Sequence, residues 1–347
     1  MSDDWRQLYK NSVVEPEELA RILDVDPEPL QRVHARYPMR TSRYYLDLVQ
    51  SVDCPIGLQV VPNLHELDSC GQVDPLGEEN HSPNRAIVHR YPDRALFYVS
   101  YRCATHCRFC SRKRRVDDPK TIDANERERG LRYIAEHEEL RDIIVSGGDP
   151  LLLGDDELED ILTKLREIKH VQIIRLDSRL PVTLPQRVTE KLCSLLKNFQ
   201  PLYLNTHFNH PREITPAAKR ACAALADAGI PLGNQSVLLK GVNDSPSVMR
   251  ELVHGLLRLR VKPYYLYQCD PVIGACHFRC PVDKGLEIIS SLQGHTSGLA
   301  VPHFVLDGPQ GKGKVTVAPD HVVSRSAENL LLRNYAGQSF EYPDGKS

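Results

Sequence analysis

Short apolar runs alternate with amphipathic segments along the chain from about residue 95 onward. Six of these runs have the length and apolar content of buried strands, and they lie at 95–101, 142–146, 171–176, 202–206, 229–239 and 262–268. Helical spacing is clearest in 155–168, with Asp155 or Asp156 placed to cap its start, and it returns in 217–225 and 248–259. Strands and helices that alternate at intervals of about 30 residues predict βα units on a parallel sheet.

Six consecutive units, with no Rossmann glycine fingerprint after the first strand, favour an α/β fold built as a partial (βα)6 TIM-like barrel. A doubly wound sheet is the alternative. Polar segments, such as DSR after the third run, follow most of the predicted strands. In a barrel, the catalytic residues lie at these C-terminal strand ends. We expect a mostly helical N-terminal extension over 1–90, the barrel over 91–300, and a C-terminal segment over 301–347 with a glycine-rich lysine loop.

The overall charge is close to neutral. The 347 residues include 44 Lys and Arg against 46 Asp and Glu, for a formal net charge of -2. This balance argues against a protein that coats nucleic acid or an anionic membrane. No stretch approaches the ~18 uninterrupted apolar residues of a membrane span, and the start of the chain is polar and acidic rather than signal-like. We therefore expect a cytoplasmic protein with no membrane or nucleic-acid partner.

Ten cysteines are many for a cytosolic enzyme, where stable disulfides are rare. Four scattered cysteines are interpreted as small buried side chains, and a loose group near the C-terminus is assigned no metal site. The scattered four are Cys54, Cys70, Cys193 and Cys222, and the loose group is Cys269, Cys276 and Cys280. The other three cysteines are packed into one short segment, CATHCRFC, which carries the first chemical signal.

Cys103, Cys107 and Cys110 have the spacing CxxxCxxC. Thiolates select zinc, copper or iron–sulfur clusters, and a closed zinc site would need a fourth ligand, for which His106 is the only adjacent candidate. Three cysteines instead leave one iron of a 4Fe-4S cubane open. With Phe109 before the last cysteine and a predicted strand before the first, the triplet resembles the signature of radical S-adenosylmethionine (radical SAM) enzymes.

The superfamily resemblance implies the radical SAM type of barrel and a set of cofactors. Its open iron chelates S-adenosyl-L-methionine, and one-electron reduction releases a 5'-deoxyadenosyl radical, which implies an electron donor such as a flavodoxin or ferredoxin. Ser146, Gly147, Gly148 and Asp149 resemble the strand end that binds the methionine amino group. Taken alone, this SGGD segment could be an ordinary turn.

The second signal is a glycine-rich segment with two lysines at 304–319. Gly308 to Lys314 satisfies the P-loop pattern GxxxxGK, but Val315 occupies the position of the hydroxyl residue and Pro319 cuts short any following helix. A flexible surface loop is one alternative. The other is a lysine on a mobile loop that forms a Schiff base with pyridoxal 5'-phosphate, with glycines supplying the backbone freedom.

The cysteine triplet and the lysine loop together resemble the lysine 2,3-aminomutase family over about residues 74–334. The resemblance rests on HRYPDR (89–94), SGGDPLL (146–152), LPQR (184–187), LNTHFNHP (204–211), LGNQSVLLKGVND (232–244), YLYQCD (265–270) and GHTSG (294–298). It implies an isomerase that moves the α-amino group of L-lysine to the β-carbon, using a 4Fe-4S cluster, S-adenosyl-L-methionine and pyridoxal 5'-phosphate. It also implies a homo-oligomer.

Matched position by position, the resemblance assigns the three clustered cysteines to the 4Fe-4S cluster and Lys314 to pyridoxal phosphate, with Lys312 the lesser candidate. Further cofactor positions are Arg90, Tyr91 and Arg94 for the phosphate, and His207 and Gln235 for the S-adenosyl-L-methionine end. Two guanidinium groups flanking a tyrosine suit a phosphate dianion. Without the resemblance, the two arginines would be interpreted as surface ion pairs.

Arg112 matches the residue that pairs with the substrate carboxylate, and Asp270 and Asp307 match the pair that clasps the distal ammonium of lysine. Two carboxylates in one pocket repel unless a cation joins them, so they select a basic side chain over an acidic one. Caps or loop salt bridges are the alternative for both aspartates. Taken alone, the RKRR run would be interpreted as a solvated basic patch, and this alternative stays open for Lys113, Arg114 and Arg115.

Two features depart from the family. Ser245 stands where the family has a zinc-binding cysteine, and the chain ends without the family's C-terminal cysteine cluster, so we expect no structural zinc. Gln310 and Lys312 stand where glycines are usual. Three alternatives stay open: arginine in place of lysine as the substrate, a member of the fold that has lost pyridoxal phosphate, and a zinc-ribbon module that binds nucleic acid through RKRR.

Overall fold

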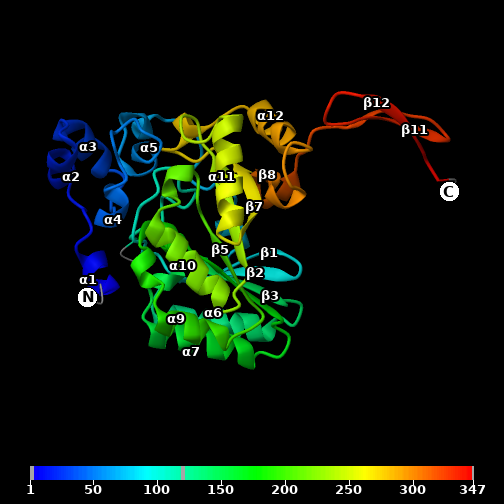
Figure 1. The fold of residues 1–347 in the computed structure, drawn as a ribbon. Coiled ribbons are helices and arrows are strands. Elements are labelled where there is room, and N and C mark those ends of the chain that lie inside the picture. Colours follow the sequence, from blue (N-terminus) through cyan, green and yellow to red (C-terminus); the bar gives the residue numbers. More distant parts are fainter. Residues whose placement is uncertain (1–3, 119–121, 346–347) are drawn as a thin grey trace.

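The computed structural model describes residues 4–118 and 122–345. Residues 1–3, at the polar start of the chain, 119–121 and 346–347 lie outside the described part. Most of the chain folds around one sheet, with helices packed against it (Figure 1). None of the helices in the described part is long and apolar enough to cross a membrane.

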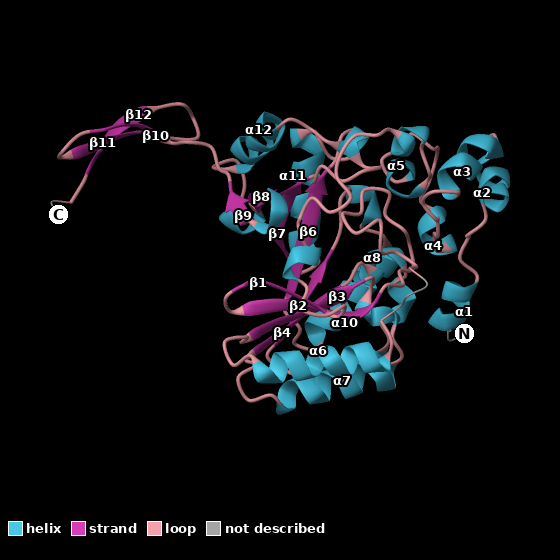
Figure 2. Cartoon of the chain, turned by 180° about the vertical axis from the view of Figure 1, so that it is seen from behind, coloured by secondary structure: helices cyan, strands magenta, loops and turns pink. Residues whose placement is uncertain are grey.

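The sheet has nine strands, and their order in space is their order in the chain. They are β1 (Ile87–Tyr91), β2 (Arg94–Ser100), β3 (Asp142–Gly147), β4 (Ile173–Asp177), β5 (Leu202–Thr206), β6 (Leu232–Leu238), β7 (Val261–Gln268), β8 (His303–Gly308) and β9 (Gly313–Thr316). Strands β2 to β8 run parallel, and β1 and β9 are antiparallel to their neighbours. Because β1 and β9 are each paired on one side, the sheet is a partial barrel (Figure 2).

The six predicted strands correspond to β2 to β7, which confirms the predicted partial α/β barrel. The consecutive strand order excludes the doubly wound alternative, in which the order reverses. The predicted number of parallel strands is wrong by one, because β8 is a seventh. Its apolar run is short and leads directly into the glycine-rich segment, so its pattern alone does not separate a strand from the approach to a loop.

Helices connect the parallel strands. They are α6 (Ala124–Glu136), α7 (Asp155–Glu167), the short α8 (Leu180–Thr183), α9 (Glu190–Lys197), α10 (Pro216–Asp227), α11 (Pro246–Arg258) and α12 (Val282–Leu292). The three predicted helices are confirmed as α7, α10 and α11. The predicted cap of α7 is wrong: the cap is Gly154, and Asp155 and Asp156 lie in the first turn, where the helix dipole favours carboxylates.

Five short helices precede the sheet: α1 (Trp5–Lys10), α2 (Pro16–Leu23), α3 (Pro27–His34), α4 (Arg43–Leu46) and α5 (Gly57–Val60). They lie on the side of the barrel away from the C-terminus (Figures 1 and 2). Large side chains anchor them, because Tyr45 is fully buried and the indole of Trp5 lies 4.6 Å from the guanidinium carbon of Arg187. Two of their side chains, those of Tyr45 and Gln59, contact Arg179, which lies directly after β4.

After β9 the chain leaves the barrel. β10 (Val322–Arg325), β11 (Asn329–Arg333) and β12 (Ser339–Pro343) form a separate antiparallel sheet, which projects away from the rest of the molecule (Figure 1). Aromatic side chains on this sheet are exposed, with Phe340 45% and Tyr342 57% accessible. The cavity described next is lined only by residues that precede this sheet.

Candidate active site

The loops and strand ends of the barrel surround a cavity of about 580 Å³. Every residue that the sequence assigned to a cofactor or to the substrate lines this one cavity: Arg90, Tyr91, Arg94, Cys103, Cys107, Cys110, Arg112, Ser146, Gly147, Gly148, Asp149, His207, Gln235, Asp270, Asp307 and Lys314. Lys312, the lesser candidate for the cofactor lysine, is exposed and is not part of the lining. The residues are therefore brought together, while the role of each one stays a prediction.

The three clustered cysteines lie in the loop that follows β2. Burial raises the pKa of Cys103 well above its usual value, and the nearby Asp149 carboxylate and the two other cysteines raise it further. Burial, with the charge of Cys107, raises the pKa of Cys110 to about 11. The sulfur atoms are thus close enough to disfavour one another's charge, and a bound metal centre would compensate thiolates in this position.

The three thiols fit a cluster better than a single metal ion. Among the described residues, no three His, Cys, Asp or Glu side chains are grouped so that they could hold one metal ion. A 4Fe-4S cubane binds each thiolate at a different iron, so it needs sulfur atoms spread around a larger body. All three cysteines line one cavity, which offers space for a ligand of the fourth iron.

His106 is not placed to act as the fourth ligand of a zinc site, so the zinc alternative loses its only adjacent candidate. Its ring is buried, with Nε2 3.0 Å from the Asp117 carboxylate and Nδ1 3.2 Å from the carbonyl oxygen of Pro38. Burial acts to raise the pKa of Asp117, but the hydrogen bond and charge of His106 outweigh it and lower that pKa. The histidine holds the cysteine loop against the N-terminal region.

The SGGD segment at the end of β3 is more than a turn, because its glycines allow a close approach to the cysteine loop. A Cβ on Gly147, whose φ is +120°, would lie 2.3 Å from the carbonyl oxygen of Ser100. A Cβ on Gly148 would lie 2.3 Å from that of Arg102. The amides of Gly148 and Asp149 donate to these two oxygens at 2.6 and 2.8 Å. The glycines therefore fix the start of the loop that carries the cysteines.

Asp149 is buried and held by three donors. Its carboxylate accepts hydrogen bonds from the Ser178 hydroxyl at 2.7 Å, the Arg179 amide at 2.8 Å and the Leu151 amide at 3.1 Å. Burial raises its pKa to about 6, against the lowering effect of these hydrogen bonds. Its position on the cavity wall beside the cysteines suits an acceptor for an ammonium group.

Arg90, Tyr91 and Arg94 form a cationic corner at the start of the sheet. The guanidinium carbons of Arg90 and Arg94 lie 5.0 and 4.0 Å from the centre of the Tyr91 ring. The Tyr91 hydroxyl accepts a hydrogen bond from the Lys314 amide at 2.9 Å, which links this corner to β9. Arg94 also pairs with Asp93 at 2.8 Å, so one of the two arginines makes the ion pair that the alternative interpretation expects.

Lys314 lies on β9, opposite Asp307 in the β8–β9 pairing. Its Nζ is 3.3 Å from Asp307 Oδ1 and 5.3 Å from the centre of the Tyr267 ring. The connection between β8 and β9 is a tight turn in which Gly311 and Gly313 have φ values of +80° and +87°. A strand follows the lysine where a P-loop requires a helix, which excludes the P-loop interpretation.

Asp270 and Asp307 differ in their partners. Asp307 pairs with Arg90 at 3.1 Å as well as with Lys314. The Asp270 carboxylate makes no hydrogen bond or ion pair within the described part of the chain; burial raises its pKa to about 7, and the charge of Asp307 adds to this shift. Arg112, the predicted carboxylate ligand, pairs with the buried Glu78 at 2.8 Å.

The alternative of a solvated patch is wrong, because the RKRR side chains are engaged in the protein. Lys113 is buried, and its Nζ donates to Glu66 at 2.5 Å and to the carbonyl oxygens of Arg108 and Gly274 at 2.7 Å each. Burial lowers the pKa of Lys113 to about 8, against the attraction of Glu66. The neighbouring contacts are Arg114 with Asp74 at 3.1 Å, and Arg115 with the Tyr101 hydroxyl at 3.3 Å.

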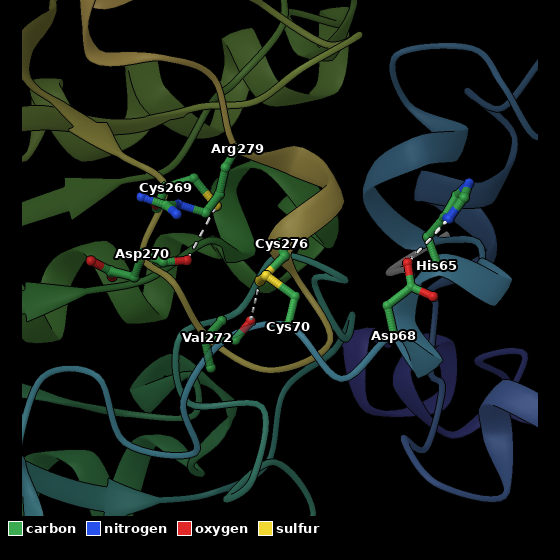
Figure 3. Close-up of a disulfide and its surroundings, with 8 residues drawn as sticks. All are labelled: His65, Asp68, Cys70, Cys269, Asp270, Val272, Cys276 and Arg279. Carbon is green, nitrogen blue, oxygen red and sulfur yellow. Dashed lines mark hydrogen bonds and ion pairs between the residues drawn. A yellow bond between two sulfur atoms is a disulfide. The ribbon is translucent and has the colours of Figure 1, made fainter.

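Cys70 and Cys276 form a disulfide beside Asp270 (Figure 3). The prediction that Cys70 is a small buried side chain is therefore wrong: Cys70 is exposed, and its partner is 206 residues away in the sequence. Two residues further on, Gln72 pairs with the backbone that follows Asp270, its amide donating to the carbonyl oxygen of Pro271 at 2.8 Å. The segment around Cys70 thus braces the loop that carries Asp270.

Sequence reasoning noted the DSR segment at the end of β4 but gave no role to Asp177, Ser178 or Arg179, all of which line the cavity. Asp177 is held by the Asn205 side chain at 3.0 Å, and burial raises its pKa. Arg179 donates to the sulfur of Cys107 at 2.7 Å. Polarity at a strand end was the available signal, but it does not tell a cavity residue from a capping residue.

Two family models match the chain: the radical SAM superfamily over residues 97–252, and lysine-2,3-aminomutase over residues 289–347. L-lysine 2,3-aminomutase from Fusobacterium nucleatum is 47% identical over 352 residues, which cover 99% of this chain and 82% of that protein. The chain belongs to the lysine 2,3-aminomutase family.

Other members of the lysine 2,3-aminomutase family match over a similar length. L-lysine 2,3-aminomutase from Acetoanaerobium sticklandii is 46% identical over 99% of this chain and 85% of its own length. Glutamate 2,3-aminomutase from Clostridioides difficile is 42% identical over 99% of this chain and 83% of its own length. The chain is thus a radical SAM 2,3-aminomutase, an isomerase, and the zinc-ribbon alternative is wrong. Because the relatives act on two different amino acids, membership alone does not fix the substrate.

Proposed function

We propose that this aminomutase moves the α-amino group of L-lysine to the β-carbon, giving β-lysine. The observation that carries the proposal is the presence of Asp270 and Asp307 in the same cavity as Lys314 and Arg112. An ammonium group joins two carboxylates that otherwise repel, whereas a side-chain carboxylate would add a third negative charge. The relatives named for lysine support the same substrate.

Each end of the substrate would meet an opposite charge. Arg112 offers a guanidinium to the α-carboxylate, and Asp270 with Asp307 would hold the distal ammonium. Lys314 is the amine that would hold the aldehyde of pyridoxal 5'-phosphate, and Asp307, 3.3 Å from its Nζ, orients that amine in the cavity. Arg90, which pairs with Asp307 at 3.1 Å, would offer its guanidinium to the phosphate of the cofactor.

The cofactors belong to the proposal. When bound, the reduced 4Fe-4S cluster with S-adenosyl-L-methionine supplies a 5'-deoxyadenosyl radical for hydrogen abstraction, and pyridoxal 5'-phosphate supplies a π-system that delocalises the unpaired electron. The residues proposed to hold these groups are Cys103, Cys107 and Cys110 for the cluster, Ser146, Gly147, Gly148, Asp149, His207 and Gln235 for S-adenosyl-L-methionine, and Arg90, Tyr91 and Arg94 for the phosphate. A homo-oligomeric state, a cytoplasmic setting and a flavodoxin or ferredoxin as electron donor stay predictions.

A substrate competition tests the proposal. The anaerobically reconstituted protein is given equal amounts of L-lysine, L-arginine and L-glutamate, and the β-amino acids are separated and counted by mass spectrometry. We expect β-lysine to exceed each other product by at least about tenfold, which corresponds to about 1.4 kcal/mol. A predominance of β-glutamate, for which the relative from C. difficile provides the precedent, or of β-arginine would overturn the lysine assignment.

A substitution of Asp270 tests whether this carboxylate selects lysine as the substrate. Asp270→Asn should lower kcat/KM for lysine by about 10 to 100-fold, since a hydrogen bond to a charged group is worth about 1.5–3 kcal/mol. Asp227→Asn is the matched control, because its carboxylate pairs with Arg260 on the surface of the molecule. Equal losses in both variants would show that Asp270 does not act on the substrate.

A further inference from the structure

Arg179, directly after β4, makes an unusual contact with a cysteine of the triplet. Its Nη1 donates to the sulfur of Cys107 at 2.7 Å. Its guanidinium carbon also lies 5.3 Å from the centre of the Phe109 ring, within the same cysteine loop. The side chain is only 9% exposed, so little water competes for this hydrogen bond. A full positive charge is thus held directly against the sulfur of a cysteine that lines the cavity.

The remaining donors of Arg179 are fixed by partners from distant parts of the chain. Nη2 donates to Glu213 at 2.8 Å, to the Gln59 amide oxygen at 2.5 Å and to the Tyr45 hydroxyl at 3.1 Å. Nε donates to the carbonyl oxygen of His207 at 3.1 Å. With donors on three sides engaged, the guanidinium plane cannot turn away from Cys107 without breaking several buried hydrogen bonds.

Glu213 limits how much positive charge reaches the cysteine. Its carboxylate is fully buried and also accepts hydrogen bonds from the Tyr45 hydroxyl at 2.5 Å and from the amides of Asn209 and His210 at 2.5 and 2.7 Å. The carboxylate is therefore anchored independently of Arg179. The two charges oppose each other, with the arginine nearer to the sulfur.

We propose that Arg179 is a positioning residue that raises the reduction potential of the cluster bound by Cys103, Cys107 and Cys110, with Glu213 moderating the effect. The inference rests on the proposed cluster. The reaction it concerns is the transfer of one electron from a protein donor of the flavodoxin or ferredoxin class to the cluster: the donor is oxidised, the cluster is reduced, and no bond in the protein forms or breaks.

The direction of the effect follows from charge. A cluster with three thiolate ligands is anionic, and the added electron makes it more so. A cation or hydrogen-bond donor at a ligating sulfur stabilises the more negative, reduced state, and so raises the potential. Water entering a loosened site would also stabilise the reduced state. Loss of Arg179 and loosening of the site therefore move the potential in opposite directions, which separates an electrostatic role from a merely structural one.

A redox titration of the reconstituted protein, followed by electron paramagnetic resonance, tests the proposal. We expect Arg179→Gln to lower the reduced-to-oxidised ratio at a fixed potential by at least tenfold, a shift of about 59 mV for one electron. Glu213→Gln should shift the potential upward, because it keeps the acceptor oxygen and removes the opposing charge. Arg187→Gln is the control: this arginine is also fully buried, but it bonds to the carbonyl oxygens of Leu151 and Leu153 and to Asp155.

Iron and sulfide are measured in every sample. Wild-type protein that binds no cluster would refute the proposed function itself. With clusters present, an unchanged or raised potential in Arg179→Gln would overturn the role of Arg179. If that variant does not fold, Glu213→Gln carries the test, and Arg179→Lys, which keeps the positive charge, should stay close to the wild-type potential. An unchanged or lowered potential in Glu213→Gln would overturn the proposal, and folded variants that lose the cluster would overturn it in favour of a role in assembly.

Discussion

Asp270 is the residue whose charge, in the proposed function, would decide when the cavity attracts a lysine side chain. Its pKa is raised to about 7 by burial and by the charge of Asp307. The ionised fraction therefore changes steeply around neutral pH, in a range where the lysine side chain stays protonated. Because only the ionised form attracts an ammonium group, affinity for a basic amino acid should increase with pH through this range.

We expect the Kd of L-lysine to rise by about tenfold when the pH falls from 8 to 6, because about nine-tenths of a group is protonated one unit below its pKa. Isothermal titration calorimetry on protein loaded with pyridoxal phosphate measures this. Norleucine, which lacks the distal amine, is the matched ligand and should show a much smaller change. Identical pH profiles for the two ligands would remove Asp270 from the ammonium site.

The same carboxylate should destabilise the fold. Its folded pKa is raised above the usual 3.8. Between pH 4 and 7 the unfolded chain therefore releases a proton that the folded chain retains, and stability falls as the pH rises. Asp270→Asn should then increase the free energy of unfolding by about 2 kcal/mol at pH 8 and leave it unchanged at pH 4. Urea denaturation at both pH values checks this, and a loss of stability at pH 8 would contradict the raised pKa.

An absorbance spectrum can show which of Lys314 and Lys312 holds pyridoxal phosphate. Lys314 lines the cavity and its Nζ lies 3.3 Å from Asp307, whereas Lys312 is not part of the lining. Lys314→Ala should abolish the absorbance of lysine-bound pyridoxal phosphate at about 420 nm, and Lys312→Ala should leave it in place. The reverse result would identify Lys312 as the cofactor lysine, in place of Lys314, the residue that lies opposite Asp307 in the β8–β9 pairing.

At the scale of elements, the sequence pattern predicted the strands and helices whose formation depends on local sequence. The strands β2 to β7 and the helices α7, α10 and α11 follow from periodicity, and the strand-end rule brought SGGD and the cysteine triplet to one cavity. Contacts between residues that are far apart in the sequence leave no local pattern from which they could be predicted. The bond between Cys70 and Cys276, and the buried ion pair of Lys113 with Glu66, depend on how whole elements meet.

The disulfide should stabilise the segment that braces the Asp270 loop. Removing a crosslink over a long stretch of chain costs about 2–4 kcal/mol. Cys70→Ser with Cys276→Ser should lower the free energy of unfolding by this amount and raise KM for lysine, since the loop after β7 loses a support. A dithiol reductant should destabilise the wild type and not the double variant. Cys54→Ser, at a free cysteine, is the control. If the reductant leaves the free energy of unfolding of the wild type unchanged, the disulfide does not form.

At the scale of the whole molecule, the residues before the sheet are part of the site. Tyr45 and Gln59 hold Arg179 against the cysteine loop, and Glu66 holds that loop from another side. Glu66 binds Arg108 at 2.6 Å and Lys113 at 2.5 Å, and Lys113 continues to the carbonyl oxygen of Gly274. One buried carboxylate thus connects the N-terminal region, the cysteine loop and the loop after β7.

The role of Glu66 in holding the cysteine loop can be tested by removing its charge. Glu66→Gln leaves two buried cations without their carboxylate, and breaking a buried ion pair in this way costs about 3–5 kcal/mol. The variant should therefore unfold at lower urea and bind less iron, because the cysteine loop loses its anchor. Glu79→Gln is the matched control: its carboxylate is 65% exposed and pairs with Arg114, so its loss should change stability by less than about 1 kcal/mol. Full stability and full iron content in Glu66→Gln would show that the cysteine loop is held without the N-terminal region.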